Sequence, residues 1–384
     1  MNKYAKYSTI LYLILVEFMY GFELTYIKLP DIIYNIFLFI SIFLFVASSA
    51  LGKWTLIEIF RSFLLIVVAL GVYFSSGETL FLMMILSCIV IRNVSYSMAL
   101  KTIFGTRLVS FILVISSSLL GFIPINKMEV AKGAFGTYTG YGLGYQHPNN
   151  LAQAFLVLCL LYLAIKNSNL NYKNYVGTLF LGLIFYRITG GKTEFILLFI
   201  ACLSLIFLKS RKGKDIASHF TIPYVIFTIF LWVVIPFVYA TSSGILRNIA
   251  YSLNGVLNGR FSNASMLFEI NKFTMFGKIV NLDALKSMYG YNVVDNGYVF
   301  LLFNYGLIGF LLIIFLYIYA IKSFIKKQIF TYVVIIATFL TLGLMENVIR
   351  AMFMNVTIIF WYEFINCSYY KQVKSISQNQ IEDK

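Results

Sequence analysis

The residues whose chemistry stands out in this chain of 384 residues lie in three polar segments between long apolar runs. The first, 140–150, ends in His147-Pro-Asn-Asn150; the second, 187–194, is a short turn with two cations; the third, 241–297, is the longest. Guanidinium and ammonium groups bind phosphate, and imidazole and amide groups bind polar ligands. Because hydrocarbon excludes such side chains, these segments must lie in water or at lipid headgroups.

The first segment allows two interpretations. Pro148 suits the first turn of a helix, which His147 or Asn149 could cap. Alternatively, His147, Asn149 and Asn150 present an imidazole and two amides to a polar ligand. The sequence does not choose between them. The glycines at 140, 142 and 144 loosely resemble a nucleotide-binding turn, but no strand precedes them and an apolar span follows, which argues against that function.

The second segment, Arg187-Ile-Thr-Gly-Gly-Lys-Thr-Glu194, carries two cations in a tight turn. Arg187 and Lys192 could extend toward lipid headgroups. They could instead form an anion site beside the backbone N–H groups that open the next helix. Glu194 could complement the dipole of that helix or form an ion pair with Lys192.

In the third segment, Arg260 follows a glycine and offers two parallel donors that suit a phosphate, although a lone Arg is often surface decoration. Asp295 stands where the next apolar run begins, so it could cap a helix as readily as serve a site. We predict Arg247 and Asn296, from the same segment, as further substrate-binding residues.

The elements that position these segments are apolar helices. Only 12% of the residues are charged and the mean hydropathy is +0.85, whereas about 25% are charged in a typical soluble domain. We predict an all-α polytopic membrane protein, one integral membrane domain over 1–384, whose first helix is not cleaved. Runs of spanning length predict about twelve helices, at about 8–26, 32–51, 56–74, 79–91, 107–123, 149–165, 174–188, 193–208, 220–240, 298–321, 329–345 and 348–366.

The basic residues indicate the orientation. Lys and Arg, including Lys53, Arg92 and Arg107, gather in alternate connections, which places those connections and both termini in the cytoplasm. The three polar segments then share the outer face, and 241–297 forms one large extracytoplasmic loop. Topology explains the net charge of +15 better than nucleic-acid binding does.

Other polar residues receive simpler interpretations. Glu17 and Glu58 should lie near helix ends or in polar bundle contacts, and Glu346 and Arg350 could be a plain helix pair four residues apart. Intramembrane acids can also mark a proton path, so a transporter stays open. The four cysteines lie in apolar runs without a disulfide or zinc pattern. We expect the tail 375–384 to be disordered and cytoplasmic.

The order of these features resembles the O-antigen polymerase and ligase family, in particular the Wzy-type polysaccharide repeat-unit polymerases. Four motifs between about 140 and 310 carry the resemblance: Gly144–Asn150 entering a helix, Thr189–Thr193 where the family often has Ser-x-Ser-Arg-Thr, Gly259-Arg260, and Val294–Tyr298 followed by 301–309. Lys192 replaces the commoner Arg and lacks its bidentate fork. Asp295 stands where many ligases have His, which favours polymerase over ligase.

The resemblance implies a helical fold of the GT-C glycosyltransferase type in the bacterial cytoplasmic membrane. It implies that oligosaccharide repeats linked to undecaprenyl pyrophosphate are joined into capsular, exopolysaccharide or O-antigen chains, alongside a flippase and a chain-length regulator. Arg260, with Arg187 or Lys192, would hold the leaving pyrophosphate. Asp295, Glu194 or His147 would take the proton of the acceptor hydroxyl. Neither an Asp-x-Asp pair nor a His cluster marks the outer segments, so we expect no metal and no cofactor.

Three alternatives remain: a ligase, a transporter or flippase of lipid-linked glycans, and a receptor or assembly subunit without enzymatic activity. A carrier should concentrate polar residues at mid-membrane, often in broken helices. Here the sequence concentrates them in the outer segments. Dependence on Arg260 would argue against the receptor or assembly subunit.

Overall fold

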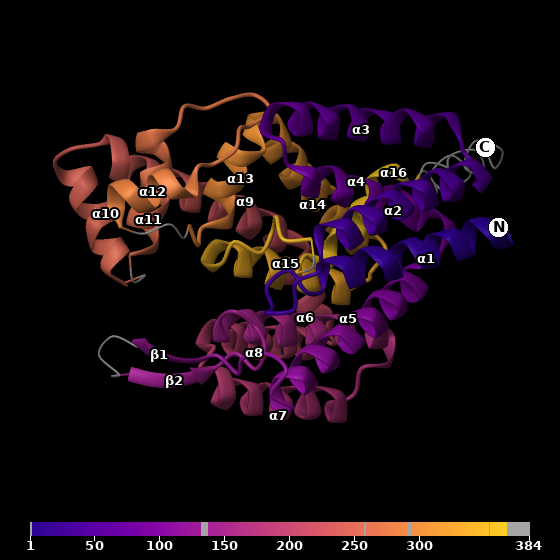
Figure 1. The fold of residues 1–384 in the computed structure, drawn as a ribbon, viewed down its shortest axis with the longest axis horizontal. Helices are drawn as coiled ribbons and strands as arrows, with labels where there is room; N and C mark the ends of the chain where they lie inside the picture. Colours follow the sequence, from indigo (N-terminus) through magenta and orange to yellow (C-terminus); the bar gives the residue numbers. More distant parts are fainter. Residues whose placement is uncertain (1, 132–136, 257–258, 291–293, 353, 367–384) are drawn as a thin grey trace.

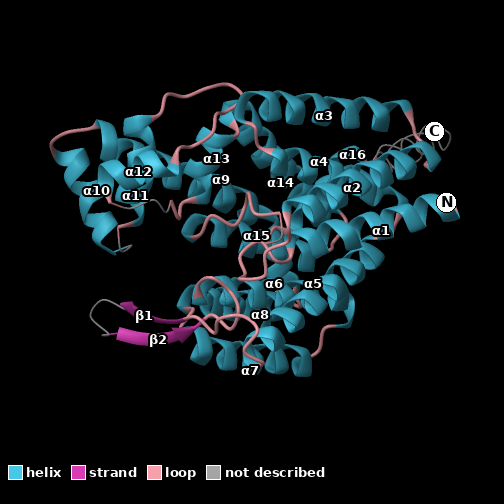
Figure 2. Ribbon diagram, viewed as in Figure 1, coloured by secondary structure: helices cyan, strands magenta, loops and turns pink. Residues whose placement is uncertain are grey.

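The computed structural model describes residues 2–131, 137–256, 259–290, 294–352 and 354–366. Almost all regular structure is helical, which confirms the predicted class, and a single two-stranded hairpin is added among the described residues (Figure 2). The predicted tail 375–384 and Cys367 lie outside the described residues. The helices are α1 (Lys3–Tyr20), α2 (Asp31–Leu51), α3 (Leu56–Ser76), α4 (Thr79–Val90), α5 (Tyr96–Leu119), α6 (Pro148–Lys166), α7 (Tyr172–Thr189), α8 (Lys192–Phe207), α9 (Arg211–Thr241), α10 (Ile245–Val256), α11 (Arg260–Ile270), α12 (Leu282–Tyr289), α13 (Gly297–Asn304), α14 (Gly306–Lys326), α15 (Phe330–Met345) and α16 (Tyr362–Ile365).

Six of the described helices are long and apolar enough to cross a membrane: α2, α3, α5, α6, α9 and α14. The shorter apolar stretches Thr79–Asn93, Phe330–Met345 and Val356–Ile365 accompany them. Many large apolar side chains of these helices face outward, among them Phe39, Phe60 and Phe227. An apolar surface of this extent suits lipid rather than water. The chain is therefore a helical protein suited to a membrane.

The helices form a bundle with two chemically different ends (Figure 1). One, which we name the loop end, carries α10, α11, α12 and the hairpin; the other, which we name the basic end, carries the start of α1. Contacts between distant residues define each end. Glu78 and Arg350 meet at the loop end, whereas Asn2 donates to the carbonyl of Leu51 at the basic end. The chain thus alternates between the ends as the sequence predicts.

The predicted span 298–321 is broken. α13 stops at Asn304, Gly306 has φ of 70°, and α14 begins there. The break frees backbone groups, which the passing segment 274–278 takes up: the N–H of Leu307 donates to the carbonyl of Thr274 at 3.0 Å. This satisfaction matters because hydrocarbon supplies no substitute partner. A Cβ on Gly277 would lie 2.1 Å from the carbonyl oxygen of Asn304, so this crossing needs glycine.

The predicted span 348–366 is not one helix. Turns occupy the described residues between Glu346 and Asn355, a 3-10 helix (η4) covers Val356–Trp361, and α16 adds four residues. Buried polar groups explain the irregular backbone: the side chain of Asn355 donates to the carbonyl of Ile349, and Tyr317 donates to the side-chain oxygen of Asn355. These bonds replace the regular helical ladder.

The hairpin pairs β1 (Lys127–Ala131) with β2 (Thr137–Tyr141) in antiparallel register. It lies at the loop end beside α7 (Figure 2), where the hydroxyl of Tyr138 donates to the carbonyl of Arg187. Gly144, which follows, has φ of 90°, and a Cβ there would lie 2.9 Å from Val114. The glycines of this motif therefore serve close packing, in agreement with the rejection of a nucleotide-binding turn.

The large loop 241–297 folds into α10, α11 and α12 and has a hydrophobic core of its own. Ala264, Leu267 and Leu285 from the loop pack with Val299 and Phe303 of α13. Trp232 of α9 stacks edge-on against Phe261 at 5.3 Å. The loop is thus anchored to two apolar helices, which sets where its polar residues lie.

Arg107 corrects the predicted topology. The sequence analysis placed it in a basic connection, but it lies within α5 with its side chain buried. Its Nε lies 2.6 Å from a carboxylate oxygen of Glu17, and an Nη donates to the carbonyl of Met352. A charge inside an apolar bundle requires such partners, so the pair belongs to the core.

Candidate functional site

A polar cavity of about 280 Å³ opens at the loop end, and we name it the central cavity. Its wall combines residues from the turn after α1, from α6, from the segment before α13 and from the turns after α15. Its polar residues are Glu23, Asn150, Gln153, Asp295, Glu346, Asn347 and Arg350. Elements far apart in the chain thus bring acids, amides and one guanidinium to one space.

Arg260 lies behind two of these acids. Its Nη2 is 3.3 Å from an oxygen of Glu346 and its Nη1 is 3.9 Å from an oxygen of Asp295. The Arg260 side chain is 20% exposed and is not part of the cavity wall. Buried Nη1 has no hydrogen-bond acceptor among the described residues. We name Arg260, Asp295, Glu346 and the nearby Glu194 the acid cluster.

Local bonds fix Arg260 at the start of α11. Gly259 precedes it with φ of 81°, a left-handed conformation that glycine adopts readily. The side-chain oxygen of Asn254 accepts from the N–H groups of Phe261 and Ser262, both at 2.9 Å. These bonds cap the first turn of α11. A cation at a helix N-terminus is unfavourable unless anions surround it, and the two carboxyl groups supply them.

Asp295 is held by its neighbour. The side chain of Asn296 accepts from the N–H groups of Tyr298 and Val299 and donates to the carbonyl of Trp232. With 1% of its surface exposed, Asn296 is buried and does not line the cavity. Its role here is to cap α13 and thereby to position Asp295, in place of the substrate contact that the sequence predicts.

The acid cluster holds more carboxyl groups than cations. Burial is the main cause that raises the pKa of Glu346, to about 8; Glu194 and Asp295 add to it, and Arg260 opposes it. Burial also raises the pKa of Asp295, while Arg260 and His147 lower it. Glu346 consequently keeps a proton at neutral pH, so its contact with Arg260 is a hydrogen bond to a neutral acid.

Glu194, a predicted catalytic residue, is 5% exposed in the first turn of α8. It lies close enough to Glu346 to influence that group's charge, although it is not on the cavity wall. A Cβ on Gly191 would lie 2.9 Å from a carboxylate oxygen of Glu194. The glycine turn therefore leaves room for the acid to fold back beside the helix start.

Arg350 supplies the cation that lines the central cavity. Its Nη1 lies 3.5 Å from a carboxylate oxygen of Glu78, and its guanidinium stands 4.4 Å from the ring centre of Phe300. It does not pair with Glu346, so the predicted helix pair is wrong. The reason is that the chain turns after Met345, whereas the i, i+4 contact needs a continuous helix.

The His-Pro-Asn-Asn motif contributes in two ways. The Nδ1 of His147 accepts from the N–H of Asn149 at 3.1 Å, which is the capping geometry. Asn150 lines the central cavity, and so does Gln153, three residues later on the same face of α6. His147 is also near enough to Asp295 to lower its pKa. Both interpretations of the motif therefore hold, each for different residues.

Three predicted substrate-binding cations lie elsewhere. Arg187, Lys192 and Arg247 are exposed and do not line the central cavity. Among the described residues, Arg187 and Arg247 form no ion pair with an acid. The prediction that these three cations contact substrate stays a prediction.

The sequence analysis did not place Glu23, Gln153 or Glu346 in the site, and it gave Arg350 the wrong partner. Acids and an arginine at the outer ends of apolar runs were the available signal. In the part of the chain that the structure describes, no group of three His, Cys, Asp or Glu residues could hold a metal ion.

The arrangement can bind a polar ligand and accept a proton. Asp295 is a carboxyl group on the cavity wall beside cationic groups, and such a group can serve as a general base. Arg350 and the positive potential of Arg260 can stabilise negative charge. No family model, no curated protein sequence and no solved structure matches this chain.

Proposed function

We propose that this protein is a Wzy-type polymerase, which joins undecaprenyl-pyrophosphate-linked oligosaccharide repeats into polysaccharide. The observation that carries the proposal is the central cavity, where the acid cluster meets Arg350 at one end of a bundle suited to a membrane. A base and cations at such a place suit a substrate with a lipid anchor, an anionic leaving group and sugar hydroxyls. The order of the four motifs supports the same class.

The reaction assigns a separate role to each group. The oxygen of an acceptor hydroxyl bonds to the anomeric carbon of the donor glycan, and the bond from that carbon to the pyrophosphate oxygen breaks. The hydroxyl proton passes to Asp295. The electron pair leaves with the lipid pyrophosphate, whose charge the cations stabilise.

Protonation favours Asp295 over Glu346 as the base. The pKa of Glu346, about 8, leaves this group mostly protonated at neutral pH, and a protonated acid cannot accept the hydroxyl proton. Asp295 stays nearer to its ordinary pKa because Arg260 and His147 oppose the effect of burial. In this mechanism Glu346 limits the negative charge beside the site, and Arg260 keeps Asp295 ionised.

Two arginines would handle the leaving group. Arg350 reaches it directly from the cavity wall, and Arg260 acts from behind the two acids, with its buried Nη1 left for an oxygen of the ligand. A guanidinium is suited to both places because it stays charged and offers parallel donors. This assignment adds Arg350 to the cation that the sequence indicated.

The finer topology belongs to the same proposal. We take about twelve spans, a GT-C-like arrangement, both termini in the cytoplasm and the loop end outside the bacterial membrane. In a Cys367→Ser background, Ser287→Cys in the loop should react with an impermeant thiol reagent in intact cells. Lys212→Cys at the basic end should not react. The opposite labelling pattern would reverse the orientation.

The direct test is elongation by purified protein in detergent. Undecaprenyl-pyrophosphate-linked repeats should become longer lipid-linked chains without nucleotide, ion gradient or divalent metal, as seen on gels and by mass spectrometry. Removing one stabiliser of leaving-group charge, with Arg260→Ala, should slow the reaction about 30- to 1000-fold. The matched control Lys272→Ala removes an exposed cation of the same loop and should elongate normally.

Each alternative predicts a different outcome of that test. A ligase would act only when given a separate acceptor, and a carrier would leave the substrate unchanged. Unchanged substrate with folded protein and a verified donor would refute the polymerase proposal. Activity that a chelator removes and magnesium restores would keep the reaction class and refute the metal-free mechanism.

The transporter keeps two structural observations in its favour, the buried pair Glu17–Arg107 and the break between α13 and α14. Carriers often use such broken helices to line a binding site. Here the segment 274–278 takes up freed backbone groups of the break. The break therefore anchors the loop, which favours an enzyme.

A further inference from the structure

A second cavity, of about 470 Å³, adjoins the central one, and we name it the side cavity. It lies between the turn after α1 and the turn from α3 to α4, and its polar wall consists of Tyr20, Glu23, Lys28, Tyr34, Glu78 and Thr79. Glu23 and Leu80 belong to the walls of both cavities. A ligand in the side cavity would therefore border the space that contains Asp295.

A buried hydroxyl without a partner marks the same place. Tyr305 has no exposed surface, and its hydroxyl has no hydrogen-bond partner in the part of the chain that the structure describes. Glu78, Arg350 and Glu23 are its charged neighbours. A buried phenol normally finds a partner, so an unsatisfied hydroxyl beside a cavity indicates that a ligand supplies one.

Arg350 connects the two cavities. It lines the central cavity, and it pairs at 3.5 Å with Glu78, which lines the side cavity. Both partners keep part of their side chains accessible, 29% and 23%. A ligand can thus reach them without breaking the pair.

The composition of the side cavity identifies the class of ligand. Carboxylates accept hydrogen bonds from hydroxyls, and tyrosine rings supply apolar faces with polar tips, as binding of sugars requires. Two acids, Glu23 and Glu78, are balanced by the two cations Arg350 and Lys28, so the wall has no excess of charge. A volume of 470 Å³ lies within the range of about 300–1,000 Å³ that is typical of ligand pockets.

We propose that the side cavity binds the terminal sugars of the acceptor glycan, an uncharged and hydroxyl-rich oligosaccharide, and delivers its hydroxyl across Glu23 to Asp295. This inference rests on the proposed function and adds a separate place for the second substrate. The donor pyrophosphate then occupies the central cavity beside Arg350, and the two glycans approach from different sides.

The anionic alternative is less suited to this wall. A lipid phosphate would meet Glu23 and Glu78 at short range and would compete with Glu78 for Arg350. Repulsion by two carboxylates disfavours a second anion in the same space. The hydroxyl of Tyr305 and the tyrosine pair Tyr20 and Tyr34, whose ring centres are 6.2 Å apart, suit a neutral sugar.

The test measures binding of a soluble probe to the purified full chain in detergent. The probe is the free oligosaccharide that mild acid releases from the lipid-linked repeat, and calorimetry measures its affinity. Removing one hydrogen-bonding group, with Tyr305→Phe or Glu78→Gln, should weaken binding about tenfold in each case. The matched controls Tyr141→Phe and Glu129→Gln change exposed residues of the hairpin and should bind as the wild type does.

Asp295→Asn separates this inference from the proposed function, because it should abolish elongation and still bind the probe. Elongation by the wild type with equal probe affinity in Tyr305→Phe and Glu78→Gln would overturn the side-cavity site and leave the polymerase standing. Failure of the wild type to bind the probe would also overturn it. Tyr305→Phe removes only a hydroxyl without a protein partner, so it should stay folded and keep the test decisive.

Discussion

The two ends of the bundle use the same residue types in different proportions. At the basic end, Glu58 pairs with Arg92 at 3.0 Å, and Glu363 contacts Lys327 and accepts from Tyr96. Each of these acids has a cation of its own. In the acid cluster of the loop end, by contrast, three carboxyl groups surround one guanidinium, and two of them line a cavity.

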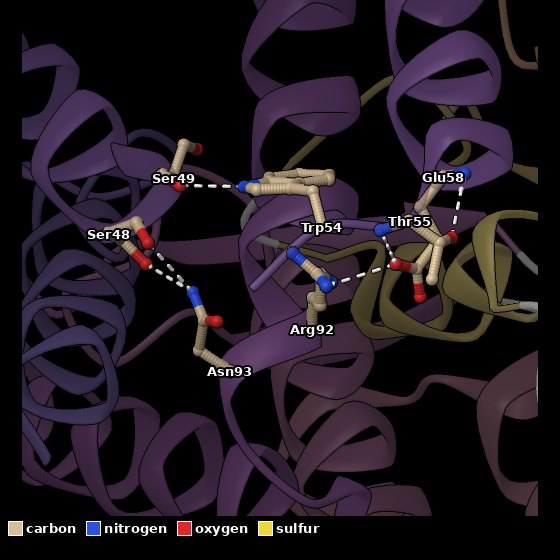
Figure 3. Close-up of polar contacts among 7 residues, drawn as sticks. All are labelled: Ser48, Ser49, Trp54, Thr55, Glu58, Arg92 and Asn93. Atoms are coloured by element: carbon tan, nitrogen blue, oxygen red, sulfur yellow. Dashed lines mark hydrogen bonds and ion pairs between the residues drawn. The ribbon is translucent and has the colours of Figure 1, made fainter. Parts of the chain in front are cut away.

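The basic end shows what a saturated ion pair looks like. In Figure 3 one oxygen of Glu58 receives both the N–H of Thr55 and the guanidinium of Arg92. The guanidinium stacks 4.2 Å from the ring centre of Trp54, whose N–H donates to the carbonyl of Ser49. These contacts join the start of α3 to the turn after α4.

The difference separates structural from chemical use of charge. Where each acid has a cation and backbone donors, its charge is spent on holding helices together. Where acids exceed cations and face a cavity, one acid retains a proton and another is left to react with a ligand. The ratio of charges and their access therefore predict which end is the site, and the next three predictions test that distinction.

The largest expected effect is on chemistry at the loop end. Asp295→Asn keeps the shape of the side chain and removes the base, so the rate of chain elongation should fall about 10²- to 10⁴-fold. The melting temperature should change little. The matched control Asp283→Asn alters an exposed acid of the same loop and should elongate normally. A normal rate in Asp295→Asn would exclude this residue as the base.

A smaller effect is expected on stability at the basic end. Glu58→Gln leaves Arg92, whose side chain is 10% exposed, without its counter-charge. Breaking a buried pair in this way typically costs about 3–5 kcal/mol. Thermal or denaturant unfolding in detergent should show the loss, while the rate per folded molecule stays unchanged. A lower rate with unchanged stability would contradict the division between the two ends.

The smallest expected effect is a dependence of stability on pH. Glu346 has a pKa of about 8 in the fold against an ordinary value of 4.5, so the folded protein holds a proton that the unfolded chain releases. Stability from this group is complete below pH 4.5 and declines as pH rises toward 8. The melting temperature of wild type should therefore fall across this interval, and Glu346→Gln should flatten the slope. An equal slope in both proteins would refute the assignment.

The sequence anticipated much of the framework because apolar periodicity and short connections are local properties. The runs between residues 32 and 91 coincide closely with α2, α3 and α4, and Pro148 does open α6. Arg260 and Asp295 were also placed in one site, and they lie 3.9 Å apart. Helix 348–366 was predicted wrongly because an apolar run cannot reveal buried partners such as Tyr317, which draw Asn355 out of a helix.

By itself, the sequence determined the helical class, the alternation of helices between a basic and a polar end, and the candidate pair Arg260 and Asp295. Only the tertiary structure decided which charges meet. It joined Arg260 to Glu346, Arg350 to Glu78 and Arg107 to Glu17 across long separations in the chain. The reason is physical: composition and periodicity select which face of a helix is apolar, whereas ion-pair partners depend on how distant helices and turns pack together.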